Sequence, residues 1–232
     1  MPNKTALPAH QARSRESLAR LLKATAEVLD KYGIEGATVP RIAARAGLSP
    51  GAVYRRFPDK DALLREVCIR LLEENYRQTK EKFAVERWKD KSLAEIAHAV
   101  VEFILQTNRT HRGLVRALLF FSLQHPDPAF VRRSEALRGK TFEHVVELVL
   151  TRRREIRHAD PEFAARFAML MTRTDAQGVL VLPHSPTDLG HLVPGIDRQL
   201  EHELPRMFLR YLGVEDSEDD GDGRARLQPA RG

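Results

Sequence analysis

Apolar residues recur along most of the chain at the i, i+3, i+4 spacing of an amphipathic helix. In the first such stretch, Leu18, Leu21, Leu22, Val28 and Leu29 follow this spacing. No pair of alternating apolar and polar runs around a short turn indicates a β-hairpin. The pattern therefore predicts an all-α fold of about nine helices, at about 14–32, 39–46, 50–57, 60–84, 93–107, 112–124, 128–154, 161–181 and 194–212.

Capping residues mark where several of these helices begin. A serine or aspartate precedes a proline at Ser49–Pro50, Asp127–Pro128 and Asp160–Pro161, which places an N-cap before a residue that needs no hydrogen-bond partner for its nitrogen. Thr38 is a further N-cap candidate, and the segment from Ser92 to Glu95 has the pattern of a capping box. These signals predict five helix starts independently of the apolar pattern.

Charge is unevenly distributed along the chain. The whole sequence has a net charge of +6, and residues 1–63 alone carry eleven basic and six acidic residues. A positive surface of this kind suits a phosphate-bearing partner. No stretch approaches the ~20 apolar residues of a membrane span, and the N-terminus lacks the apolar run of a signal peptide. The only cysteine, Cys68, allows no disulfide within the chain, so we expect a cytoplasmic protein.

Residues 38–60 contain two short predicted helices joined by a tight turn. Gly47 can adopt the left-handed backbone that the turn requires, and Ile42, Ala43 and Val53 supply small apolar side chains at helical spacing. A helix of about eight residues is not stable alone, so the helix at 14–32 must supply the rest of the core. This is the helix-turn-helix plan, in which the second helix enters the major groove of DNA.

A dense set of positions carries a more specific signal. These are Leu21 to Gly33, Thr38, Ile42, Ala43, Ala46, Gly47, Leu48, Ser49, Gly51, Val53, Tyr54, Phe57, Lys60, Leu63 and Leu64. In these residues the segment 21–64 resembles the DNA-binding domain of the TetR family of transcriptional regulators. The resemblance covers about a fifth of the chain. It departs from the family pattern at Leu29, where an aromatic residue is frequent, and at Pro50, where a basic or polar residue is frequent.

The resemblance implies which side chains would hold the DNA backbone. Thr38 would cap its helix and offer its hydroxyl to a phosphate, and Tyr54 would bond the backbone through its own hydroxyl. Lys60 would contact a phosphate from the start of the next helix, and Arg41 would help to position the backbone. From the residues alone, Tyr54 could instead be a core aromatic side chain.

The edge that reads the base sequence is expected early in the second short helix. Ser49, Pro50, Gly51 and Arg55 would face the major groove, where the Arg55 guanidinium can bond guanine O6 and N7 in bidentate fashion. Arg56 would contact the backbone. The alternative for the Arg55–Arg56 pair is a solvated helix face without a partner.

The rest of the chain is expected to be the helical ligand-binding and dimerisation domain that the resemblance implies. Helices 161–181 and 194–212 would form a homodimer interface, so that the two subunits read a palindromic operator in double-stranded DNA. Apolar stripes that include Phe163, Leu200 and Phe208 support this, although about half of such residues are expected in the subunit core. A small-molecule effector of unknown identity would bind between the middle helices, and helix 60–84 would carry its effect to the DNA-binding domain.

The expected organisation is a disordered arm over 1–12, the helix-turn-helix domain over 13–64, the ligand-binding domain over 65–213 and a disordered acidic tail over 214–232. The predicted loop at 183–195 precedes the last helix. Eight apolar side chains are candidates for the cavity wall, with no ligand contact assigned to any of them: Trp88, Phe103, Leu105, Leu118, Phe120, Phe121, Phe130 and Phe142.

Other functional classes find little support in the sequence. No Walker loop, G-x-S-x-G or G-x-G-x-x-G motif indicates an enzyme. His98 and Glu102 have no third ligand at a readable spacing, so neither a metal site nor a cofactor is predicted. Cys68 is expected to be a packed thiol, with a redox sensor as the alternative. The expected function is a repressor released by its ligand, and the alternative is a helical scaffold or an activator without ligand control.

Overall fold

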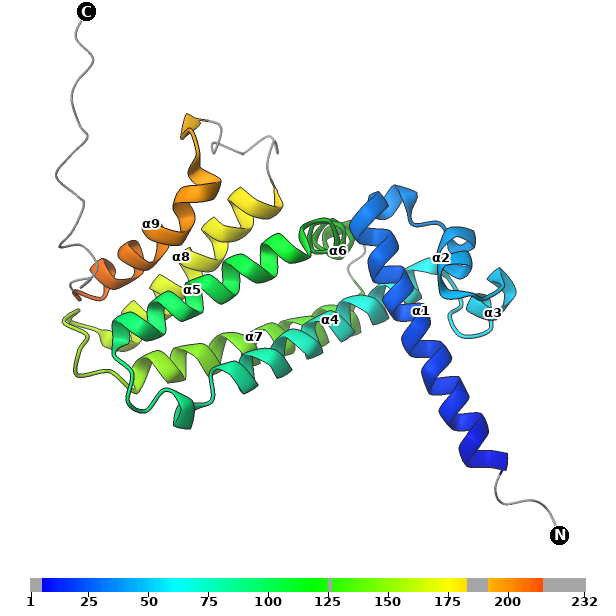
Figure 1. The fold of residues 1–232 in the computed structure, drawn as a ribbon, viewed down its shortest axis with the longest axis horizontal. Helices are drawn as coiled ribbons and strands as arrows, with labels where there is room; N and C mark the ends of the chain where they lie inside the picture. Colours follow the sequence, from blue (N-terminus) through cyan, green and yellow to red (C-terminus); the bar gives the residue numbers. More distant parts are fainter. Residues whose placement is uncertain (1–5, 125–126, 183–191, 215–232) are drawn as a thin grey trace, which may run out of the picture.

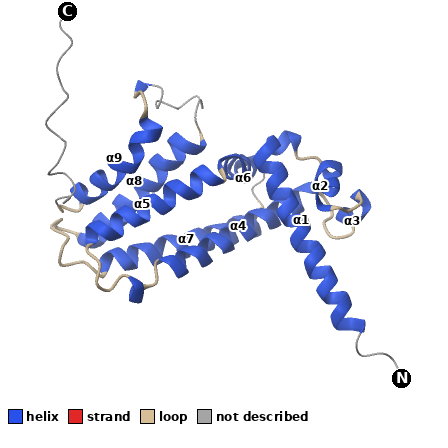
Figure 2. Cartoon of the chain, viewed as in Figure 1, coloured by secondary structure: helices blue, strands red, loops and turns tan. Residues whose placement is uncertain are grey.

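The computed structural model of the protein describes residues 6–124, 127–182 and 192–214. These residues form nine α-helices and one 3-10 turn, and Figure 2 shows no strand among them. The prediction of an all-α fold is therefore confirmed. Residues 1–5 of the expected arm at 1–12, most of the loop at 183–195, and all but the first residue of the expected tail at 214–232 lie outside the described residues.

The N-terminal part consists of α1 (Ala6–Gly36), α2 (Val39–Ala46), α3 (Pro50–Tyr54) and the start of α4 (Lys60–Lys82). Regular helix in α1 is interrupted at Gly33, whose φ of 66° lies in the left-handed region. The helix begins at Ala6 and so includes residues 6–12, which the sequence pattern assigned to a disordered arm. Alanine, leucine and arginine favour helix, and extending an existing helix is less costly than starting one.

The remaining elements are η1 (Val85–Arg87), α5 (Leu93–Thr110), α6 (Arg112–Gln124), α7 (Pro128–Leu150), α8 (Pro161–Val181) and α9 (Ile196–Tyr211). In Figure 1, α4 and α7 run side by side along one edge of the molecule, and α5, α8 and α9 pack together along the other. The short helix α6 lies across the end of this bundle and packs against α1.

The predicted N-caps form as expected. Asp127 and Asp160 each accept a hydrogen bond from the backbone N–H three residues on, at 2.8 and 3.0 Å. Ser92 and Glu95 form a complete capping box. Because the proline follows the cap at the first helical position in α7 and α8, its missing N–H leaves no bond unmade.

Two helices end at least three residues earlier than the pattern predicts. The α3 helix ends at Tyr54 instead of residue 57. The chain continues as a turn over Arg55 and Arg56, and Pro58 disfavours a helical backbone at Phe57. The α7 helix ends at Leu150 instead of 154. There the Arg152 guanidinium turns away to donate to the carbonyl oxygens of Trp88 and Lys91, at 2.6 and 2.7 Å, and so ties the end of α7 to the segment before α5.

The hydrophobic core does not stop at the end of the first three helices. One cluster of buried residues runs from Leu21 in α1 and Val53 in α3 through Leu63 in α4 to Phe121 in α6 and Phe130 in α7. The small N-terminal bundle and the larger helical bundle therefore share packed side chains. Movement of α6 or of the start of α7 must disturb the packing of α1 and α4.

Candidate functional site

The turn between α2 and α3 has the geometry that the sequence predicts. Gly47 has φ 66° and ψ 38°, and the following N–H of Leu48 donates to the Ala43 carbonyl at 2.9 Å. Thr38 Oγ1 accepts from Arg41 N at 3.4 Å, and Ser49 Oγ accepts from Ala52 N at 3.2 Å. The two side-chain caps and the left-handed glycine fix the orientation of α3 relative to α2.

One side of this unit is buried and the other is open to solvent. Ile42 and Val53 are buried against α1, whereas Ser49, Pro50, Gly51 and Arg55 are exposed. The Tyr54 side chain is 54% exposed, which rules out the core interpretation of this residue. In the predicted reading edge, Ser49, Pro50 and Gly51 are therefore exposed at the start of α3 and Arg55 directly after its end. The α3 helix lies at the end of the molecule away from α9 (Figure 1).

Three basic side chains near this surface hold the unit to α1. Arg41 Nη1 donates to the Gly36 carbonyl at 2.5 Å, and its guanidinium lies 4.5 Å from the centre of the Tyr32 ring. Arg56 Nη1 donates to the Ser14 carbonyl at 3.2 Å. Lys60 is half-buried, and its Nζ donates to the Ile34 carbonyl at 2.9 Å. An ammonium group has further N–H donors, so a phosphate contact by Lys60 stays a prediction.

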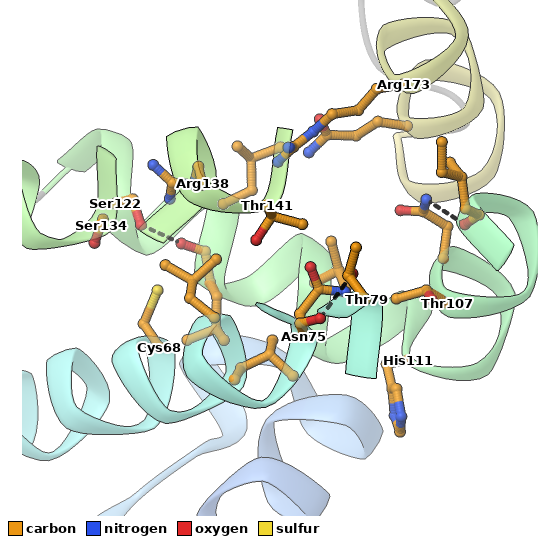
Figure 3. A pocket seen from close by; sticks show the side chains of 18 of the residues that line it. Cys68, Asn75, Thr79, Thr107, His111, Ser122, Ser134, Arg138, Thr141 and Arg173 are labelled. Carbon is orange, nitrogen blue, oxygen red and sulfur yellow. Dashed lines mark hydrogen bonds between the residues drawn. The ribbon is translucent and has the colours of Figure 1, made fainter. Parts of the chain in front are cut away.

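A second feature is a cavity of about 490 Å³ inside the larger bundle (Figure 3). It is lined by side chains from α4, α5, α6, α7 and α8, and its volume falls in the usual range of small-molecule sites. Among the eight apolar candidates from the sequence, Phe103, Leu118 and Phe130 line it. The other five candidates do not line it, because helical periodicity shows which face is apolar but not which neighbour that face meets.

Most polar groups of the cavity wall are bonded to their own helix. Ser122 Oγ donates to Leu118 O at 2.7 Å, Thr79 Oγ1 to Asn75 O at 2.8 Å and Thr141 Oγ1 to Leu137 O at 3.0 Å. Ser134 is different. Its side chain is 1% exposed, and its hydroxyl has no hydrogen-bond partner among the described residues. Such a group is costly unless something enters the cavity to bond it.

Two arginines also line the cavity, Arg138 from α7 and Arg173 from α8 (Figure 3). In the part of the chain that the structure describes, neither has an ion pair or a hydrogen bond. Burial lowers the pKa of Arg173, and the positive charge of Arg138 lowers it further. The Cys68 thiol lines the same cavity, and burial raises its pKa despite the opposing charge of Arg138. A protonated, buried thiol does not suit the redox-sensor alternative.

Sequence reasoning did not single out Ser134, Arg138 or Arg173. A signal was present, because Arg173 lies at helical spacing from Met169 and Ala176 and so falls on the apolar face of its helix. A charged residue on an apolar face marks either a buried ion pair or a site. Without the neighbouring helices, the sequence cannot distinguish these two possibilities.

The last two helices present both a core face and an exposed apolar face. Leu200, Leu204 and Phe208 of α9 are buried within the subunit, so that part of the predicted interface stripe belongs to the core. Phe163 and Leu170 of α8 remain 54% and 48% exposed. The two residues lie about two turns apart on one face of α8. Exposed large apolar side chains on one helix face are typical of an interaction surface.

Metal and membrane chemistry find no support in the described ranges. No group of three or more His, Cys, Asp or Glu side chains there is placed to hold a metal ion. None of the described helices is long and apolar enough to cross a membrane.

Comparison with known proteins identifies the N-terminal unit. Residues 21–67 match the family model described as bacterial regulatory proteins of the tetR family. The N-terminal unit is therefore similar to that of the tetR family. The matched residues are those that form α2, the turn, α3 and the start of α4, together with the part of α1 that packs on them.

The curated sequence relatives match only the N-terminal part of this chain. The HTH-type transcriptional regulator BetI of Stenotrophomonas maltophilia is 44% identical over 55 residues, which is 24% of this chain and 28% of the relative. BetI of Paraburkholderia phytofirmans is 38% identical over 61 residues, or 26% and 31% of the two chains. This chain therefore aligns with less than a third of each relative.

Solved structures extend the similarity to the whole fold. A TetR-family regulator from Mesorhizobium loti has a TM-score of 0.62 and 18% identity, covering 87% of this chain and 97% of that one. The regulator FadR of Bacillus subtilis, solved in complex with stearoyl-CoA, has a TM-score of 0.58 and 14% identity, covering 82% and 97%. At these identities the comparison establishes a shared fold, which includes the helical bundle that surrounds the cavity.

Proposed function

We propose that this protein is a homodimeric transcriptional repressor that binds a palindromic DNA operator and releases it when a small molecule fills the cavity. The observation that carries the proposal is the exposed edge of Ser49, Pro50, Gly51 and Arg55 on a rigid two-helix unit of TetR-family sequence. The function of the sequence relatives as transcriptional regulators supports it. DNA as the partner also favours a cytoplasmic protein.

The DNA-binding role follows from the division of labour in the N-terminal unit. Buried side chains and caps hold α3 rigidly, and the exposed edge is free to meet base edges in the major groove. Arg55 would read guanine, while Thr38, Arg41, Tyr54 and Lys60 would position the phosphate backbone. Arg41 and Lys60 would do so while they also brace the unit against α1, since each is bonded to a carbonyl there.

The dimer is proposed to form through the exposed apolar side chains of α8 and of the outer face of α9. Phe163 and Leu170 would pack against the same residues of a second copy, and Met207 of α9 is a further exposed apolar side chain available to the interface. A single short recognition helix reads few bases, so a two-fold dimer with two half-sites gives the sequence specificity that a repressor needs. A symmetric interface of this kind is self-complementary.

Release of DNA is proposed to pass through α6 as well as α4. Val115, Leu118 and Ser122 of α6 line the cavity, and the first turn of the same helix is bound to α1, where Asp30 Oδ1 accepts from Leu114 N at 2.8 Å. A ligand that favours a displaced α6 would therefore move α1 and the unit packed on it. The FadR structure with stearoyl-CoA supports a cavity in this fold as a ligand site.

The central experiment is a selection of genomic fragments bound by the purified protein, followed by gel shifts at several salt concentrations. We expect binding to a palindromic sequence that weakens as salt rises. If the protein bound no duplex DNA at low salt, the proposal would be contradicted and the helical scaffold favoured. Sequence-specific binding unaffected by any cavity ligand would favour a regulator without ligand control, including an activator.

Two variants test the assigned DNA contacts. Arg55→Ala is expected to relax base preference at one position of each half-site, at a cost of about 1–3 kcal/mol for the preferred base. Lys60→Ala is expected to weaken all sequences about equally and to flatten the salt dependence. Because Lys60 also donates to the Ile34 carbonyl, the thermal stability of the Lys60→Ala variant must be compared with that of the parent protein. An unchanged base profile in Arg55→Ala would remove the base-reading role of that residue.

A further inference from the structure

We propose that the cavity binds an apolar molecule that carries one anionic group, and that Arg138 and Arg173 hold that group. This inference rests on the proposed function, in which the cavity holds the effector, and adds the chemical class of the ligand. It is carried by two guanidinium groups from facing helices that line one apolar cavity and have no partner among the described residues.

The electrostatics of the cavity wall favour an anion over any other ligand. Two like charges lie near each other, and burial deprives Arg173 of water without providing a carboxylate in exchange. An unpaired charge in an apolar site is unfavourable. An anionic group between the two arginines would offset both effects, because guanidinium groups bind carboxylates and similar anions in a charge-assisted, bidentate manner.

The one acidic residue of the cavity wall does not fill this role. Glu135 lines the cavity one turn before Arg138 on α7, but its side chain is exposed, and it forms no ion pair with either arginine. A cationic ligand would be repelled by two guanidinium groups, and only the Glu135 carboxylate could offset that repulsion. The charge of the wall therefore disfavours cations.

The rest of the wall defines the body of the ligand and one further polar contact. Apolar side chains from several helices, among them Leu71, Phe103 and Met169, supply most of the surface. The Ser134 hydroxyl lies one helical turn before Arg138, is buried and has no partner among the described residues, so it is placed to bond the same end of the ligand. The cavity wall therefore suits an amphipathic ligand, with its anionic end beside α7 and α8 and its apolar part against the other side chains.

The test uses calorimetric titration of the full chain with probes that differ in charge at constant shape. Dodecanoate is compared with dodecan-1-ol and with dodecyltrimethylammonium, and naphthalene-1-sulfonate serves as an anion of different shape. We expect at least one of the two anions to bind, and dodecanoate to bind at least about tenfold more tightly than the alcohol or the cation. Failure of both anions to bind, or equal affinity for dodecanoate and dodecan-1-ol, would overturn the inference.

Variants locate the preference. In the double variant Arg138→Met, Arg173→Met, we expect the preference for dodecanoate over the alcohol to fall below about threefold. The matched control is Arg132→Met, because Arg132 is an exposed arginine of α7 that does not line the cavity. It should keep the full preference. Thermal unfolding confirms folding, and removal of two like charges should leave the ligand-free double variant at least as stable as the parent. A preference that survives in the folded double variant would overturn the inference.

A parallel gel shift separates this inference from the proposed function. Selective dodecanoate binding that is lost in the double variant but has no effect on operator binding supports the anion site and contradicts ligand-controlled release. Release of the operator by an uncharged compound that occupies the cavity with higher affinity than both anions supports the proposed function and overturns the anionic class.

Discussion

Gly113 allows no side chain, because α6 meets the backbone of α1 there. A Cβ atom built on Gly113 would lie 2.1 Å from the carbonyl oxygen of Asp30, which is far inside van der Waals contact. Backbone atoms cannot rotate away as a flexible side chain can. The close approach of the two helices therefore depends on glycine at this position.

Gly113→Ala is expected to destabilise the protein by about 1–3 kcal/mol, since the added methyl group forces the two helices apart. The matched control is Gly139→Ala, because Gly139 lies inside α7 and its Cβ would meet nothing within 4 Å. That change should be neutral or stabilising by up to about 1 kcal/mol, since alanine favours helix. Thermal unfolding measures both, and equal effects of the two substitutions would contradict the close contact at Gly113.

Glu95 ties together the start of α5. Its carboxylate accepts from Lys91 Nζ at 2.7 Å and from Ser92 N at 2.8 Å. The hydrogen bond from Lys91, followed by that from the Ser92 backbone, lowers the pKa of Glu95 from 4.5 to about 2. A carboxyl whose pKa is lower in the folded state stabilises the fold above its unfolded pKa and loses that effect as the pH falls through its folded pKa.

The substitution Glu95→Gln should therefore reduce the melting temperature at pH 6 and have progressively less effect as the pH falls from about 5 toward about 2. The effect is expected to be small, because the ion pair is exposed to solvent. Melting temperatures of the two proteins over this pH range measure it. A constant difference at every pH would show that the charge of Glu95 does not contribute through this titration.

The starts of helices were more predictable than their ends. Thr38, Ser49, Asp127 and Asp160 cap the helices that the sequence assigns to them, because a cap is a local interaction within four residues. The predicted end of α7 was wrong because Arg152 donates to carbonyl groups some 60 positions earlier in the chain. A local sequence pattern contains no information about such a contact.

The cavity could not be predicted from the sequence for a similar reason. Its wall combines residues from five helices between Cys68 and Gln177, and the helix faces that meet there are decided by packing. The exposed edge of α3 could be predicted because its residues lie within one short segment. The cavity arginines could not, because Arg138 and Arg173 become neighbours only in the folded bundle.

A hydrogen bond from Leu114 N to Asp30 Oδ1 links the start of α6 to α1, in addition to their packing. Asp30→Ala removes the carboxylate that accepts from Leu114 N, whereas Asp30→Asn keeps an oxygen acceptor at the same place. We expect the Leu114 amide to exchange with solvent deuterium faster in the alanine variant and almost normally in the asparagine variant, with a loss of stability of about 1 kcal/mol in the former. Equal protection of this amide in all three proteins, followed by NMR, would contradict the anchor.

At the scale of the whole molecule, specificity for a DNA sequence depends on the proposed dimer. The double substitution Phe163→Glu, Leu170→Glu places four like charges across the proposed two-fold interface, so we expect a folded monomer in sedimentation velocity experiments. Affinity for a palindromic operator should fall at least about tenfold, because one subunit engages only one half-site.

The control for this prediction is Phe120→Glu. Phe120 is a 44% exposed aromatic residue of α6, away from α8 and α9 in the sequence, and its substitution should leave the oligomeric state unchanged. A double variant that sediments as the parent protein does would place the interface elsewhere. Loss of the dimer in both proteins would point to a general loss of structure instead.

Cys68 belongs to the core shared with α1 and also lines the cavity, and the chain contains no other cysteine. A thiol reagent can therefore react with only one cysteine, which lies at the junction between the N-terminal unit and the helical bundle that contains the cavity. Its rate of modification reports how often that junction opens, because the side chain is 3% exposed when closed. The rate of thiol modification in the native protein thus measures the motion that would connect ligand and operator, without any engineered label.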